Sequence, residues 1–175
     1  MAVIKKHKKY SRPRKLFDKT RIQEENKILG KYGLKNKKEI WRADSFIGNI
    51  RSQAKDFIPK SQSEQREFLD RLVKIGLITS TEQLDDVLAL TKEDILERRL
   101  QTIVLRKNLA KTSREARQLI THRHIMLADR IITIPSQIIS VEEEKDVKRK
   151  DKKKKKAVEK LAPASVSAPE IKEEK

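Results

Sequence analysis

The spacing of apolar residues is the feature that most limits what this chain can fold into, because it keeps a helix period until Arg123 and then changes. Over residues 20–90, apolar side chains recur every three or four positions, with no strand-type alternation. Asn36 is placed to cap a helix start, and Pro59 and Gly76 are placed to end two helices. The stripes comprise Phe46, Ile47, Ile50, Ala54, Phe57 and Ile58; Phe68, Leu69, Leu72 and Ile75; and Leu84, Val87 and Leu88. We therefore predict a helical domain over residues 20–90.

Two more helices are expected next, each marked by a capping-box pattern, at Thr91–Asp94 and at Thr112–Glu115. We expect a break between them at residues 107–111. The inward-facing apolar residues would be Leu96, Leu100, Ile103 and Val104 in the first helix, and Ala116, Leu119 and Ile120 in the second. The opposite, exposed faces would carry Arg98, Thr102 and Arg106, and then Arg114, Arg117, Gln118 and Thr121.

After Arg123 the apolar period falls to about two, which is typical of strands. Residues 125–127 and 131–134 are predicted to form a hairpin through a tight loop at residues 128–130, and residues 138–141 allow one more strand. The predicted fold class is mainly α with a small α+β unit. A helical domain would be followed, over residues 91–141, by a helix-turn-helix plus β-hairpin domain. We expect a basic, extended arm over residues 1–19 and a charged tail without a stable fold over residues 142–175.

Positive charge is unevenly distributed, although the chain as a whole has a net charge of +17. Residues 1–60 carry 18 Lys and Arg against 6 Asp and Glu, and residues 98–130 carry 9 against 2. Residues 61–97, by contrast, carry 4 against 9. Two basic blocks separated by an acidic one favour two contacts on a single polyanion over a surface charged only for solubility.

Catalytic and metal-binding patterns are scarce. The chain has no cysteine, and its four glycines form no phosphate-binding loop. His122 and His124 could share a strand face, but no acidic or thiolate ligands accompany them, so we expect them among the arginines, near phosphate or ribose. Glu93 and Glu97 share a helix face and are interpreted as solvated carboxylates. We predict that the protein is no enzyme and holds no metal or cofactor. With no apolar run long enough for a membrane helix and no signal-like start, we expect an intracellular protein without membrane partners.

A nucleic acid is therefore the expected partner. The predicted contacts are Lys8, Lys9, Arg12, Arg14 and Lys15 in the arm, and Arg98, Arg99, Arg106, Lys107, Lys111, Thr112, Ser113, Arg114, Arg117, Gln118, His122, Arg123 and His124 in the second domain. Arginine suits phosphate because its planar fork can donate two hydrogen bonds. A DNA-binding helix-turn-helix regulator is the alternative. RNA is favoured over DNA because the second helix has few residues suited to base edges, and structured RNA is recognised by shape, phosphate and 2′-hydroxyl.

Long, ordered motifs in the chain resemble a known family, the S-four family of small-subunit ribosomal proteins. The motifs of its RNA-binding domain are LERRLQT (96–102), LAKTSREARQLI (109–120), HRHI (122–125) and IPS (134–136). Those of its archaeal and eukaryotic cytosolic branch are PRKLFDKTR (13–21), YGLKNKKEIWR (32–42) and LVKIG (72–76). The chain departs from the family at Asn108, at Arg123, and at Ala128–Asp129, which replaces a common Asn-Gly turn and makes a type I′ hairpin less favourable.

The resemblance implies a structural constituent of the small ribosomal subunit in the cytoplasm, with the RNA-binding domain over residues 91–141. It implies binding to the 5′ domain of the small-subunit (16S-type) rRNA and a role in early subunit assembly. It also implies a contribution to translation near the place where mRNA enters, with proteins S-three and S-five as neighbours and mRNA as an optional partner. The family positions matched for RNA contact are Arg98, Arg99, Lys111, Thr112, Ser113, Arg114, Arg117, Gln118, His122 and His124.

Overall fold

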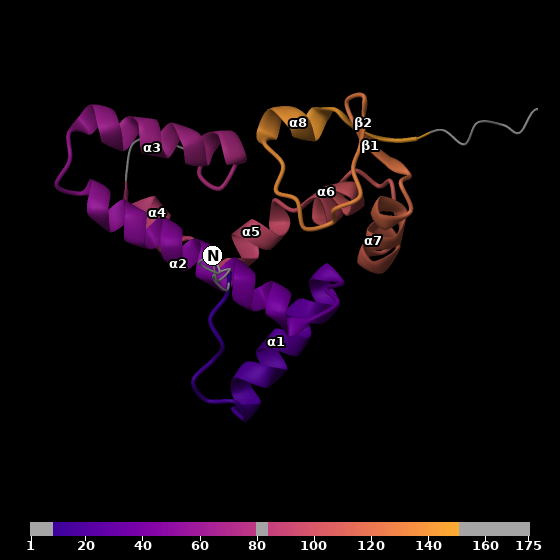
Figure 1. Ribbon diagram of the computed structural model, residues 1–175, viewed down its shortest axis with the longest axis horizontal. Coiled ribbons are helices and arrows are strands. Elements are labelled where there is room, and N and C mark those ends of the chain that lie inside the picture. The colour runs from indigo at the N-terminus through magenta and orange to yellow at the C-terminus, as the bar shows by residue number, and fades with distance from the viewer. Residues whose placement is uncertain (1–8, 80–83, 151–175) are drawn as a thin grey trace, which may run out of the picture.

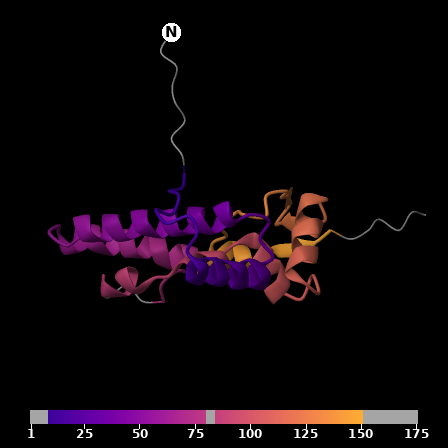
Figure 2. The same cartoon turned by 90° about the horizontal axis from the view of Figure 1, so that it is seen from below.

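The computed structural model describes residues 9–79 and 84–150, so Lys8 and the tail beyond residue 150 lie outside it. Figure 1 shows a three-cornered arrangement, with α2 and α3 at one corner, α1 at a second, and α6, α7 and the strands at the third. Seen from below, the same body is flat and elongated (Figure 2). Its elements are α1 (Lys19–Tyr32), α2 (Lys37–Phe57), α3 (Gln62–Ile75), α4 (Asp85–Ala89), α5 (Lys92–Glu97), α6 (Leu100–Arg106), α7 (Ser113–Thr121), β1 (Ile125–Leu127), β2 (Arg130–Ile131), α8 (Val141–Lys145) and β3 (Val147–Arg149).

The helix ends follow the capping residues of the sequence. Gly76 ends α3 at φ 79°, a left-handed conformation that glycine adopts without strain. The capping box between Thr91 and Asp94 is confirmed at the start of α5. Thr112 accepts the Glu115 N–H as predicted, but the Glu115 carboxylate accepts the N–H of Lys111 at 2.8 Å, so the second box is only half formed. α2 begins after Asn36, although the Asn36 side chain makes no capping hydrogen bond.

Two apolar cores form, as the stripes predict. The first lies among α1 to α5 and includes Ile40, Ile47, Phe68, Leu72 and Val87. The second lies under α6, α7 and β1 and includes Leu100, Ile103, Val104, Ile120 and Ile125. Ile95 and Leu96 pack in the first core, so the two cores divide between α5 and α6 rather than at residue 91. The expected burial of Phe46 and Ile58 is wrong, because both side chains are exposed.

The single helix expected after Thr91 is two helices. α5 ends at Glu97 and α6 begins at Leu100, with Arg98 and Arg99 as the intervening cap residues. The chain breaks there because residues 98 and 99 bond to the segment that follows the hairpin: the Ile139 N–H donates to the Arg98 carbonyl oxygen at 3.1 Å. This break turns both arginine side chains away from the face that a continuous helix would give them.

The hairpin is shorter than predicted, and a third strand joins it. β1 pairs antiparallel with β2 through Ala128 and Asp129, and β2 ends at Ile131, not at residue 134. Ala128 has a φ of 48° and Asp129 has no positive φ, so the loop is not a type I′ turn, which needs both. Asn108 and Arg123, the other two departures from the family pattern, also have left-handed φ angles, of 56° and 63°.

The C-terminal segment is ordered further than expected. The expectation of no stable fold from residue 142 onward is wrong for residues 142–150, which contribute most of α8 and all of β3. The sheet order is β2-β1-β3, and β3 places Val147 in the second core. Instead of a strand over residues 138–141, Ile138 makes one bridge to Arg99 and Val141 starts α8. Within the residues that the structure describes, no helix is long and apolar enough to cross a membrane.

Candidate nucleic-acid interface

The outer side of α7 and its ends carries an open cluster of basic and polar side chains. The inner side buries Ala116, Leu119 and Ile120, which leaves the opposite side in solvent. We call this outer cluster the exposed basic face; it consists of Lys111, Arg114, Gln118, His122 and Arg123. The face begins at the positive end of the α7 dipole, which favours an anion there.

Strand β3 adds cations that sequence reasoning missed. Lys148, Arg149 and Lys150 are exposed, and the Lys150 N–H donates to the His124 carbonyl oxygen at 2.8 Å. This bond brings the end of β3 to the C-terminal end of α7. The signal was present in the sequence as the start of a lysine run, but its charge density favoured a disordered tail over a strand. Arg130, on β2, is likewise exposed and was not singled out.

Arg98 and Arg99 do not lie on an exposed face, contrary to the sequence prediction. Their exposed fractions are 8% and 5%. The Arg98 guanidinium pairs with Glu144 of α8 at 2.8 Å and donates to the Ile139 carbonyl oxygen at 3.1 Å. The Arg99 guanidinium pairs with Glu39 of α2 at 2.6 Å. Both arginines therefore connect parts of the protein to one another.

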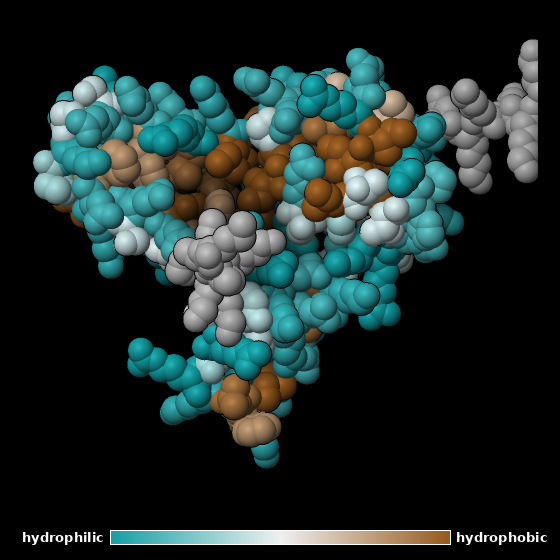
Figure 3. Space-filling view, viewed as in Figure 1, coloured by the Kyte–Doolittle hydropathy of each residue, from teal (hydrophilic) through white to brown (hydrophobic). Residues whose placement is uncertain are grey.

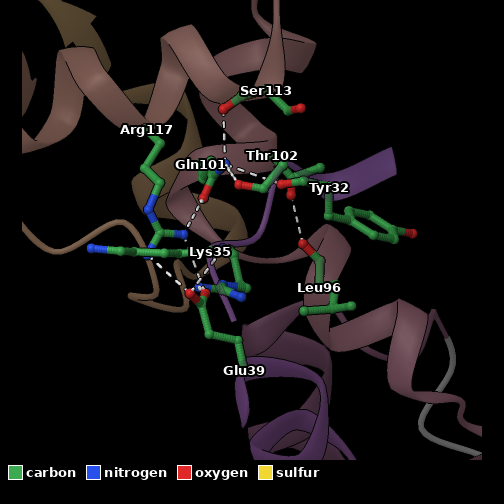
Figure 4. A network of polar contacts seen from close by, with 10 residues as sticks. Tyr32, Lys35, Glu39, Leu96, Gln101, Thr102, Ser113 and Arg117 are labelled. Atoms are coloured by element: carbon green, nitrogen blue, oxygen red, sulfur yellow. Dashed lines mark hydrogen bonds and ion pairs between the residues drawn. The ribbon is translucent and has the colours of Figure 1, made fainter. Parts of the chain in front are cut away.

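Arg117 pairs with the same carboxylate as Arg99, that of Glu39, although it lies one turn from the exposed Arg114 on α7. Its guanidinium donates to Glu39 at 2.9 Å and to the Gln101 side-chain oxygen at 3.4 Å (Figure 4). Burial raises the pKa of Glu39, but the hydrogen bonds and charges of Arg117 and Arg99 outweigh burial and hold that pKa below its ordinary value. Glu39 therefore stays ionised between two guanidiniums.

Gln101 completes the contact between the two cores. Its buried amide nitrogen donates to the carbonyl oxygens of Tyr32 at 3.0 Å, Gly33 at 3.1 Å and Ser113 at 2.8 Å, as Figure 4 shows in part. Gly33 lies so close to α7 that a Cβ there would meet the Ser113 Oγ at 2.6 Å. We call this set the junction: Glu39, Arg98, Arg99, Gln101, Arg117 and Glu144, with the Gly33–Ser113 contact.

The remaining predicted residues of the second domain are divided between the two regions. Arg106 is exposed and pairs loosely with Glu97 at 3.5 Å and Glu144 at 3.9 Å. Lys107 is half-buried and donates to the carbonyl oxygens of Lys145 and Val147, so it supports the C-terminal segment. Thr112 caps α7, and Ser113 packs against Gly33. Their side chains border the exposed basic face without extending it.

The basic arm runs along the outside of α2. Lys9, Arg12, Arg14 and Lys15 are exposed, as predicted, whereas Lys8 lies outside the described residues. The Ser11 N–H donates to the Ser45 hydroxyl at 3.2 Å, and the Tyr10 and Trp41 rings lie 6.1 Å apart. The arm is thus attached to the first core, with its cations free on the outer side.

Metal ligation has no support in the part of the chain that the structure describes, where no group of three His, Cys, Asp or Glu could hold an ion. The arrangement instead provides two sets of exposed cations on different elements, which the contacts of the junction connect. Such sets can neutralise phosphates and release counterions, which is the chemistry of polyanion binding.

Comparison with known proteins agrees with this geometry. Residues 98–145 match the S4 domain family. Over 145 residues, the chain is 51% identical to small ribosomal subunit protein uS4 of Thermoplasma acidophilum, across 79% of this chain and 73% of that protein. It is 44% identical over 145 residues to uS4 of Saccharolobus islandicus, across 80% of each chain. These relatives are structural proteins of the ribosome and not enzymes. The chain therefore belongs to the uS4 family of small ribosomal subunit proteins.

Proposed function

We propose that this protein is a structural constituent of the small ribosomal subunit and binds small-subunit rRNA through its exposed basic face. One observation carries the proposal: Lys111, Arg114 and Arg123 are exposed on the S4 domain and have no acidic side chain within ion-pair distance among the described residues. Cations that the fold leaves unpaired on one side of a helix are suited to phosphate.

The proposed contact set differs from the one inferred from sequence. Arg98, Arg99, Arg117 and Lys107 hold the protein together, so they support the interface from behind. The proposed RNA contacts are Lys111, Thr112, Arg114, Gln118, His122, Arg123 and His124 around α7, Arg106 beside it, Lys148 on β3 and Lys150 directly after it, and Lys9, Arg12, Arg14 and Lys15 on the arm.

The finer role follows from the family. In this proposal the rRNA segment is the 5′ domain, the protein binds early in subunit assembly in the cytoplasm, and its place on the subunit is near the point where mRNA enters, beside S-three and S-five. Two separated cationic surfaces on one protein support an assembly role, because they can brace two rRNA helices at once.

A salt titration of binding to deproteinised small-subunit rRNA from Thermoplasma acidophilum tests the proposal. If about 6–10 phosphates are contacted, affinity should fall roughly 10³–10⁵-fold between 50 and 200 mM salt. Replacing Lys111 and Arg114 together by Ala should weaken binding and reduce the salt slope by about 2, roughly 1 for each lost phosphate contact. The matched control, Lys55→Ala with Lys74→Ala, removes the same charge from exposed positions on α2 and α3.

The control separates a local contact from a general effect of net charge. Equal weakening by both double variants would contradict an interface at α7, and a nearly flat salt slope would reject electrostatic rRNA binding altogether. Tighter binding to duplex DNA than to rRNA in direct competition would instead favour the DNA-binding alternative.

A further inference from the structure

An apolar pair at the start of α1 is displayed in solvent. Phe17 is 91% exposed and Leu16 is 61% exposed, and Phe17 is the most exposed large apolar side chain of the described residues. Figure 3 shows an apolar patch at the lower tip of the molecule, where α1 begins in Figure 1, with hydrophilic surface above it. Exposed apolar residues gathered at one point mark an interaction site more often than scattered ones do.

The turn that carries this pair is held in place by hydrogen bonds. The Arg21 guanidinium donates to the carbonyl oxygens of Lys15 at 2.9 Å and Leu16 at 3.0 Å. Asp18, which follows Phe17, caps α1 by accepting the Thr20 N–H at 3.1 Å. The backbone on both sides of Phe17 is therefore fixed, and its ring faces solvent from an ordered turn.

Arg21 is itself anchored by a buried carboxylate. Glu25 pairs with Arg21 at 2.8 Å and with Lys37 at 3.3 Å, and it accepts the Trp41 indole N–H at 2.9 Å. Burial raises the pKa of Glu25, but hydrogen bonds from Trp41 and Lys37 and the charge of Arg21 outweigh burial. The pKa of Glu25 therefore lies below its ordinary value, and the carboxylate stays ionised. Two cations, Arg21 and Lys37, face this one carboxylate, so the cluster has a net positive charge and attracts an anion.

A hollow of about 240 Å³ lies beside the exposed pair. Its apolar walls are formed by Pro13, Leu16, Phe17, Ile22 and Trp41. Its polar edge is formed by the Arg21–Glu25–Lys37 cluster, which carries a net positive charge. An exposed aromatic ring that lines an apolar hollow with a cationic edge suits a flat, polar-edged ring attached to a phosphate.

The charges around the turn select the kind of occupant. Arg12, Arg14, Lys15 and Lys19 are exposed next to Phe17, and Asp18 is the one acidic residue in this stretch and is engaged in the α1 cap. An apolar pocket on a neighbouring protein would have to bring enough carboxylates to match this cluster. An unpaired nucleotide supplies both an aromatic face and phosphates, and bases stack on aromatic side chains at about 1–3 kcal/mol each.

We propose that Phe17 stacks on an unpaired base of the small-subunit rRNA, while Arg14 and Lys15 contact the phosphates on either side of that base. The inference rests on the proposed rRNA binding and adds a contact with single-stranded RNA, distant in sequence from the exposed basic face. The Glu25–Arg21 pair is the support that positions the stack.

Four full-length proteins test it by binding to deproteinised Thermoplasma acidophilum small-subunit rRNA: wild type, Phe17→Ala, Phe17→Leu and Phe17→Trp. The Ala and Leu variants should bind roughly 5- to 150-fold more weakly, because both lose the aromatic face, and the Trp variant should bind as well as wild type or better. Their salt slopes should equal that of wild type, since no phosphate contact is lost. Arg14→Ala with Lys15→Ala should instead reduce the slope by about 2.

Ile58→Ala is the matched control, because Ile58, the residue that follows α2, has a 58% exposed apolar side chain outside this cluster, and the change should leave binding unchanged. The Trp variant adds a spectroscopic readout, because a stacked indole is quenched on binding. The native tryptophan, Trp41, lines the same hollow, so the quenching must exceed that of wild type under the same conditions. Thermal melts of all variants should match wild type, since the replaced ring is in solvent.

Three outcomes overturn the inference while leaving rRNA binding intact. Wild-type affinity in Phe17→Ala would show that nothing stacks there, and wild-type affinity in Phe17→Leu alone would show an apolar contact without stacking. If Phe17→Ala kept its rRNA affinity but was incorporated less well into subunits reconstituted with their other proteins, the patch would be a contact with a neighbouring protein. Failure of wild type to bind rRNA would instead reject the proposed function.

Discussion

Arg114 and Arg117 lie one turn apart on α7, yet they belong to regions with different tasks. Arg114 is part of the exposed basic face and has its charge open to solvent. Arg117 belongs to the junction, where it shares Glu39 with Arg99. Positive charge alone therefore does not identify an interface in this fold. The distinguishing feature is whether a carboxylate from elsewhere in the chain meets the guanidinium.

The largest loss of stability should come from removing residues 141–150, the segment that carries Glu144, the ion-pair partner of Arg98. A chain ended at residue 140 loses this pair and the buried Val147, and it should be destabilised by at least about 5 kcal/mol relative to a chain ended at residue 150. Urea unfolding followed by circular dichroism measures the difference. Equal stability of the two chains would show that the junction does not depend on α8 and β3.

Glu39→Gln should have the next largest effect, because it leaves Arg99 buried without a counter-charge. We expect a loss of about 3 kcal/mol or more in the free energy of unfolding. Glu64→Gln is the control, since the Lys60–Glu64 pair is exposed and should contribute less than about 1 kcal/mol. A loss no larger than that of the control would mean that Glu39 does not hold the two cores together.

The acid dependence of stability should change in the same variant. A carboxyl whose pKa is lower in the folded state than its ordinary value of 4.5 stabilises the fold above that pH, and this contribution disappears as pH falls through the folded pKa. The stability gap between wild type and Glu39→Gln should therefore be constant near neutrality and narrow below pH 4.5. A gap that stayed constant throughout acid unfolding would contradict an ionised Glu39 at the junction.

The smallest stability effect, and the most direct comparison, is between Arg114→Ala and Arg117→Ala. Arg114→Ala should change unfolding by less than about 0.5 kcal/mol, whereas Arg117→Ala should cost about 1–2 kcal/mol because it removes a partly buried pair. The order should reverse in the salt slope of rRNA binding, which only Arg114→Ala should reduce. If Arg117→Ala reduced the slope as well, the guanidinium would have to leave Glu39 on binding.

Local features of this fold were predictable from sequence, because the residues that determine them are close together in the chain. The box between Thr91 and Asp94 joins residues three positions apart, and the Gly76 cap needs only its own φ. The stripes of α2, α3 and α7 are likewise set by helix geometry. Phe46 is an exception: it continues the α2 pattern but lies at the edge of the buried face.

Contacts across long separations could not be predicted in this way. The Arg99–Glu39 pair joins residues 60 apart, and the Arg98–Glu144 pair joins residues 46 apart. Helix periodicity placed both arginines outside, because it assumed one continuous helix, whereas the bridge between Arg99 and Ile138 breaks it. β3 was missed because a three-residue strand rich in cations has no pattern of its own. Its pairing with β1, the burial of Val147 and the Lys107 hydrogen bond to the Val147 carbonyl oxygen are contacts with distant parts of the chain.

The absence of a side chain at Gly33 has a consequence for how the two cationic surfaces of the protein are arranged. A methyl group at this position would meet the Ser113 Oγ at 2.6 Å, so the end of α1 packs directly against the start of α7. This close packing, together with the Arg99–Glu39 and Arg117–Glu39 pairs, sets the distance between the cations of the basic arm and those of α7. An RNA that contacts both cationic surfaces must have its helices at that distance, either before binding or as a result of it. The protein would therefore discriminate among RNAs by their folded shape.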